Sequence, residues 1–220
     1  MYVYGGPPNP PYSAERVIEN TGIYRNGTRF DVKRYPEFFA RDSRGRTRSE
    51  TNITQPQNNR VTIVDDTAGY MYVLDGAQPQ VARRYKLPAC EKVVRQKWDF
   101  PSILRGLTGL KTGDGREISI EDLGTRVIEG VSAHGLKTTQ PIGPAATGKH
   151  GPAVITHESW LCEELGVYVL GIKTDPTGVE TDRLINITRA EPDPSLFEVP
   201  PDYRIEDEPT GEQVMSKKQR

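Results

Sequence analysis

The segment 153–203 constrains the fold of this chain more than any other part of it. It contains three runs with the composition and alternation of β-strands, at residues 153–162, 167–174 and 180–189, and tight turns rich in glycine, aspartate and proline join them. After the third run, Asp193 is placed to cap a short helical turn that begins at Pro194. The segment therefore predicts an antiparallel meander that ends in a helical turn.

The residues upstream predict more strands of the same kind. Turn signals such as Asn26-Gly27 separate short runs of β-branched and aromatic residues. The predicted strands are residues 14–24, 28–35, 37–41, 46–54, 60–65, 70–75, 80–87, 117–120, 124–128 and 131–140. We therefore expect one mainly β domain over residues 14–203.

Both ends of the chain have a different composition. Residues 1–13 contain four prolines and two adjacent glycines, which predict a flexible, Pro- and Tyr-rich arm. This arm has neither a basic n-region nor an apolar h-region, so it is not predicted to be a signal peptide. Residues 204–220 are acidic and then basic with few apolar side chains, which predicts a disordered tail.

Charge and hydropathy exclude several classes of protein. The 29 basic and 30 acidic residues leave a net charge of -1, so no overall field favours nucleic acid or an anionic membrane. No apolar run approaches the roughly 18 residues that a membrane-spanning helix needs. We therefore expect a chain that neither binds nucleic acid nor spans a membrane.

The sequence contains no recognisable catalytic, cofactor or metal motif. It lacks a nucleophile elbow, a phosphate-binding loop and a dinucleotide fingerprint. Of the three histidines, His134, His150 and His157, the last lies beside Glu158 on a predicted strand, where neighbours point to opposite faces and cannot share an ion. The prediction is a protein that is not an enzyme, with no catalytic residues, no metal and no cofactor.

Two further groups of residues leave alternatives open. Cys90 and Cys162 match no metal-binding spacing, and they are either two free thiols or one disulfide. Arg41, Arg44, Arg46 and Arg48 could bind a phosphate or carboxylate, because guanidinium groups suit both. Alternatively they form a solvated hairpin face whose charge Asp42 and Glu50 balance.

One segment interrupts the β pattern. Apolar residues recur there at spacings of three and four, and Pro101 can begin a helix, so residues 101–110 predict a short helix. An apolar helix beside a sheet either packs into the core or forms the lid of a hydrophobic cavity. The lid candidates are Trp98, Phe100, Ile103, Leu104, Leu107 and Leu110.

Four segments taken together carry a family resemblance. They are FARDSRGRTRSET (39–51), VTIVDDTAGYMYVLD (61–75), EDLGTRVIEGVSAHGLKTT (121–139) and the stretch from ESWLC to VPPDY (158–203). In this order they resemble a group of exported bacterial proteins of unassigned role, which are similar to the periplasmic lipoprotein carriers and sigma-factor regulators (LolA/RseB-like). The resemblance covers residues 14–203, and none of its motifs is catalytic.

The resemblance implies an open, curved antiparallel sheet, an incomplete barrel with one or two short covering helices. It implies a periplasmic or extracellular protein whose concave face holds a lipid or the acyl group of a lipidated protein. The leading hypothesis is therefore a non-enzymatic binding protein with residues 101–110 as its lid. The alternative is a structural or assembly protein that self-associates through residues 1–12 and its sheet edges.

Overall fold

We describe a computed structural model of the chain, covering residues 10–24, 27–33, 37–51, 59–76, 79–87, 100–107, 109–113, 115–143 and 153–208. The chain divides into two compact units. Unit 1 comprises Met1–Gly6, Arg16–Arg34 and Gln96–Ile187, and unit 2 comprises Pro7–Glu15, Tyr35–Arg95 and Thr188–Arg220. Whether residues 14–203 behave as a single domain stays a prediction.

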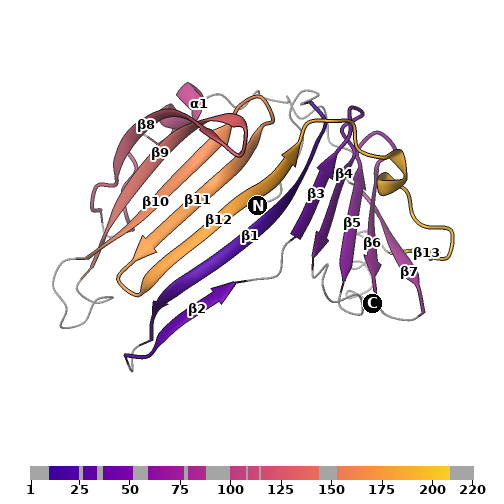
Figure 1. Cartoon of the computed structure of the whole chain (residues 1–220), viewed down its shortest axis with the longest axis horizontal. Helices are drawn as coiled ribbons and strands as arrows, with labels where there is room; N and C mark the ends of the chain where they lie inside the picture. The colour runs from indigo at the N-terminus through magenta and orange to yellow at the C-terminus, as the bar shows by residue number, and fades with distance from the viewer. Residues whose placement is uncertain are drawn as a thin grey trace, which may run out of the picture. The chain divides into compact units, whose positions relative to one another are not determined.

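Unit 1 is a sheet of long antiparallel strands with one short helix (Figure 1). Its strands lie in the order β8-β9-β10-β11-β12-β1, and β2 pairs with β1. The elements are β1 (Tyr12–Ile23, whose first residues belong to unit 2), β2 (Arg29–Lys33), α1 (Phe100–Leu107), β8 (Ser119–Ile128), β9 (Val131–Ile142), β10 (Ala153–Cys162), β11 (Val167–Asp175) and β12 (Gly178–Thr188). The three tight turns that glycine-containing sequence predicts join β8 to β9, β10 to β11 and β11 to β12.

Unit 2 is built from shorter strands and a helical turn. Its strands lie in the order β3-β4-β5-β6-β7-β13. The elements are β3 (Glu37–Arg41), β4 (Thr47–Thr51), β5 (Arg60–Asp65), β6 (Tyr70–Asp75), β7 (Val81–Lys86), the 3-10 helix η2 (Pro194–Phe197) and β13 (Arg204–Asp207). Asp193 caps η2 by accepting a hydrogen bond from the Ser195 backbone N–H at 2.9 Å, as predicted.

The helical turn closes the hydrophobic core of unit 2. Phe197, which is 5% exposed, packs with buried residues of β3 to β7: Ala40, Val61, Ile63, Leu74 and Ala82. Arg48 on β4 donates a hydrogen bond to the Leu196 carbonyl at 2.7 Å. The return of the C-terminal segment onto β4 and β5 therefore buries the apolar face of this part of the sheet.

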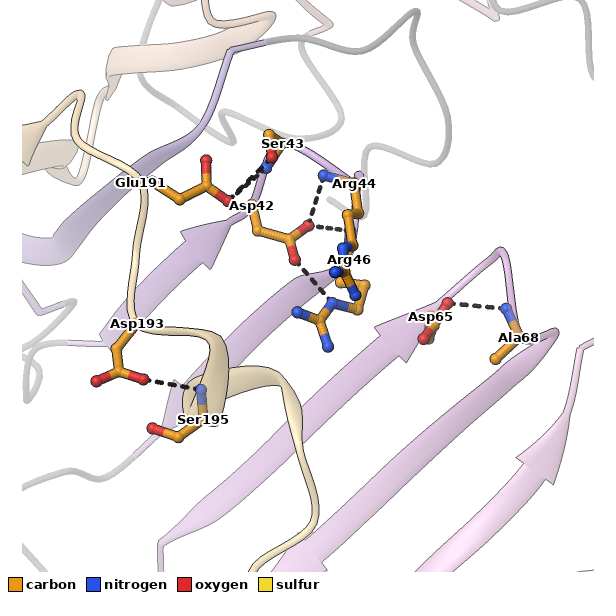
Figure 2. A network of polar contacts seen from close by, with 9 residues as sticks. All are labelled: Asp42, Ser43, Arg44, Arg46, Asp65, Ala68, Glu191, Asp193 and Ser195. Atoms are coloured by element: carbon orange, nitrogen blue, oxygen red, sulfur yellow. Dashed lines mark hydrogen bonds and ion pairs between the residues drawn. The ribbon is translucent and has the colours of Figure 1, made fainter.

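Two arginines of the cluster in unit 2, Arg46 and Arg48, pair with carboxylates of the same hairpin. Asp42 accepts hydrogen bonds from the backbone N–H of Arg44 and from the backbone and side chain of Arg46 (Figure 2). Arg48 pairs with Glu50 at 2.5 Å. These contacts match the predicted charge balance by Asp42 and Glu50 and not a phosphate site, although Asp42 itself is buried at 2% exposure.

Two predicted elements differ from the structure. Residues 117–120 and 124–128 were expected to form two strands, but a single strand, β8, spans Ser119–Ile128 with a bulge between Asp122 and Gly124, where Gly124 has a φ of 70°. The expected disordered tail begins instead with β13, which pairs in parallel with β7. Arg84 binds Asp207 there through two hydrogen bonds of 2.6 and 2.9 Å, a partnership that no local pattern reveals.

The predicted fold class is confirmed. The chain is mainly β, and among the described residues the end strands β8 and β13 each pair with one neighbour, so the sheet is open. Figure 1 shows the curvature of β8 and β9 within unit 1. In the described part of the chain, no helix has the length and apolar character to cross a membrane.

Candidate functional site: the α1 face and the Trp160 face of unit 1

Helix α1 is anchored to the sheet of unit 1 by its first residue. The backbone N–H of Phe100 donates a hydrogen bond to Glu163 Oε1 at 2.7 Å. The Phe100 ring stacks on the imidazole of His134 on β9, with centroids 3.5 Å apart and planes 9° from parallel. Phe100 is only 5% exposed, so this end of the helix is held by a polar contact and a buried ring together.

His134 is itself held in place by a carboxylate. Its Nε2 lies 2.6 Å from Asp122 Oδ1 on β8. The backbone N–H of Gly124 and the His134 ring both favour the charged carboxylate and hold the pKa of Asp122 below its usual value. The bulge in β8 creates this arrangement, because it turns the Gly124 N–H toward the Asp122 side chain at 2.8 Å. The group thus orients the ring on which Phe100 rests.

Strand register shows which residues share the face that α1 covers. His134 lies opposite Leu161 on β10, and residues directly opposite one another point to the same face. By alternation along each strand, this α1 face also carries Ile120, Leu136, Ile142 and Ile155. Leu136 and Leu161 are buried and the three isoleucines are half-buried, so apolar side chains continue along the sheet beyond the helix.

The predicted lid residues occupy different environments. Phe100 is a buried anchor, whereas Ile103, Leu104 and Leu107 are half-buried. The helix spans Phe100–Leu107 and not residues 101–110, because Gly109 takes a φ of 78° that ends it. Leu110 therefore lies beyond the helix and is 42% exposed, and Trp98 lies outside the described residues.

The opposite face of the same strands carries a second cluster, which sequence analysis missed. The Trp160 indole lies flat on Gly135, where a Cβ would meet three ring atoms at 2.6 to 2.7 Å. Above the ring lies the Arg126 guanidinium, 3.8 Å from its centroid. Trp160 is 4% exposed, and within the described ranges its Nε1 has no hydrogen-bond partner. A glycine within a predicted strand was the one local sign of close packing here.

The remaining predicted residues form no site. Cys162 is buried at the end of β10, and Cys90 lies outside the described residues, so the disulfide stays a prediction. His157 is exposed on β10, and His150 also lies outside the described residues. Within the ranges that the structure describes, no group of three or more histidine, cysteine or acidic residues is placed to hold a metal ion.

Comparisons with known proteins find structures but no sequence relatives. No family model and no curated protein matches the chain. Among solved structures, the chain is similar to the lipoprotein LppX from Mycobacterium tuberculosis (15% identity, TM-score 0.29, covering 78% of this chain and 84% of that one). It is also similar to LprF from Mycobacterium bovis (14% identity, TM-score 0.30, covering 84% of this chain and 90% of that one). A third similar structure is that of a LolA superfamily protein from Nitrosomonas europaea (10% identity, TM-score 0.34, covering 88% of this chain and 92% of that one).

A LolA superfamily protein, the kind of protein that the sequence resembles, is thus among the similar structures. All three TM-scores lie below 0.5, so the likeness supports no conclusion about the site or the activity of this chain.

Proposed function

We propose that this chain is a non-enzymatic, extracytoplasmic binding protein that holds a lipid or the acyl group of a lipidated protein on the α1 face of unit 1. The observation that carries the proposal is a helix anchored at Phe100 on this face whose further apolar residues, Ile103, Leu104 and Leu107, are half-buried. Such a helix has apolar surface left to cover a ligand.

The dimensions of the α1 face suit one acyl chain. The strand from Leu161 to Ile155 is about 20 Å long at the usual rise of about 3.3 Å per residue. An acyl chain in one leaflet extends about 15 Å, half of the roughly 30 Å bilayer core. Each methylene that leaves water contributes about 0.8 kcal/mol, so even partial coverage of such a chain supports measurable binding.

The proposed location of the protein and its self-association have less support than the proposed binding of a lipid. An extracytoplasmic place follows from the sequence resemblance alone. The structure adds no support to the alternative, self-association through residues 1–12, because residues 1–9 lie outside the described residues. Lipid binding on the α1 face is therefore the proposal that we develop.

Replacing Leu104 and Leu107 together by aspartate should weaken the binding of a dansyl-labelled fatty acid at least about tenfold. The two leucines would each lose contacts worth about 1.5 kcal/mol or more, and about 1.4 kcal/mol changes an affinity tenfold. A fluorescence titration measures the affinity, and circular dichroism checks that the β signal is unchanged.

Gly106→Asp is the control for adding an aspartate to α1, because it places one negative charge at an exposed position of the helix where a Cβ meets nothing within 4 Å. It should bind the probe as the unaltered chain does. Equal affinity in the double variant and the control would refute the lid role. An unaltered protein that does not bind the probe would refute the proposed function itself.

A further inference from the structure

The Trp160 face holds a polar group whose hydrogen-bonding capacity is unused. Trp160 is 4% exposed, and no described residue accepts a hydrogen bond from its indole Nε1–H. A buried donor without an acceptor costs about 1 to 3 kcal/mol, so native proteins normally supply one from the chain, from water or from a ligand. The indole N–H therefore marks a position where an acceptor is missing.

Arg126 places a positive charge beside this donor. Its guanidinium lies over the same indole ring, and the residue is exposed on the end strand β8. Some other arginines of the described chain, such as Arg16 with Asp182 and Arg183 with Glu19, have carboxylate partners. No described carboxylate forms an ion pair with Arg126. Its charge is thus available to a ligand.

The Trp160–Gly135 packing keeps the donor in position. Because a Cβ at position 135 would collide with the ring, only glycine lets the indole lie against β9 at this depth. Register places Gly135 opposite Trp160 on one side, and Leu170 on β11 lies opposite Trp160 on the other. These contacts hold the ring in place against the face of the sheet. The long side chain of Arg126, in contrast, can rotate about its own bonds and admit a small ligand at the edge of the ring.

We propose that Arg126 and Trp160 form a binding site for an oxyanion, either a carboxylate or a phosphate group. Among the described residues, the buried indole N–H has no acceptor and the exposed guanidinium has no carboxylate partner, and an oxyanion supplies acceptor oxygens to an N–H and a negative charge to a guanidinium at once. The site lies on the face opposite α1, so it does not depend on the proposed lipid binding. The same group could come from a free metabolite or from a lipid head group.

Titration with sodium phosphate or sodium acetate, against sodium chloride at equal ionic strength, tests the site in the full chain. The chain has two tryptophans, and a Trp98→Phe variant assigns the indole N–H resonance of Trp160 in ¹H–¹⁵N NMR spectra. We expect that resonance to move and to saturate with at least one of the two oxyanions but not with chloride. Vesicles of phosphatidylcholine with and without phosphatidic acid then separate a head group from free phosphate.

Arg126→Gln should weaken the oxyanion affinity about tenfold or more, because a hydrogen bond to a charged group contributes about 1.5 to 3 kcal/mol. Arg29→Gln, which removes the same charge from the exposed strand β2, should leave the affinity unchanged. No saturable shift with either anion would overturn the proposal, and so would an equal shift in the Arg126→Gln variant.

Discussion

Asp42→Ala should be among the most destabilising single substitutions in unit 2, costing about 3 to 5 kcal/mol of the free energy of unfolding. Asp42 is 2% exposed and accepts three hydrogen bonds, from Arg44 N at 3.1 Å, Arg46 N at 2.8 Å and Arg46 Nε at 2.7 Å. Alanine removes every acceptor at once. The Arg46 guanidinium, which also lies 5.0 Å from the Phe197 ring centroid, would lose its counter-charge.

Urea denaturation followed by circular dichroism measures this loss. Asp42→Asn should cost less than Asp42→Ala, because the amide keeps one acceptor oxygen for the turn. Asp66→Ala is the control, since Asp66 is exposed in the turn after β5 and should change stability by no more than about 0.5 kcal/mol. Equal midpoints for Asp42→Ala and Asp66→Ala would show that the buried network does not stabilise the hairpin.

Gly178→Ala should have the second large effect, and it acts on unit 1. Gly178 begins β12, where a Cβ would lie 2.1 Å from the Thr21 carbonyl oxygen and 2.8 Å from the Gly22 Cα on β1. Both atoms belong to backbone, so the strands would have to separate. We expect a loss of about 3 kcal/mol, at the upper end of the usual range for overpacking.

Gly171→Ala is the matched control for this clash. Gly171 lies on β11, next to β12, and its Cβ would meet neighbours only at 3.9 to 4.0 Å, an ordinary contact distance. Thermal unfolding of the two variants under the same conditions compares them directly. A Gly178→Ala protein that melts with the Gly171→Ala protein would mean that β1 and β12 do not approach each other this closely.

Local turn chemistry explains why most of the fold was predictable. Two of the tight turns in unit 1 have a glycine at positive φ where the sequence predicted a turn, Gly130 with a φ of 77° between β8 and β9 and Gly166 with a φ of 64° between β10 and β11. The same holds for Asp193, whose cap at η2 needs only its own neighbours. Signals that act within a few residues can be recognised before the chain is folded.

The features that were missed depend on partners far along the chain. The parallel pairing of β13 with β7 joins Arg204 to Val81, and no local alternation reveals it. The Trp160 cluster brings together β8, β9 and β10 through register, so Arg126 looks like any exposed arginine in the sequence. The helix was correctly expected but extended too far, because the spacing of apolar residues continues to Leu110 whereas Gly109, with a φ of 78°, lies beyond the last helical residue.

Native mass spectrometry of protein purified without detergent shows whether the chain carries a lipid. We expect a bound mass beside that of the chain, and denaturing solvent extraction of the same sample should recover that mass as a lipid with an acyl chain. A spectrum of the chain alone, together with an extract that contains no lipid and no binding when a fatty acid is added back, would contradict it.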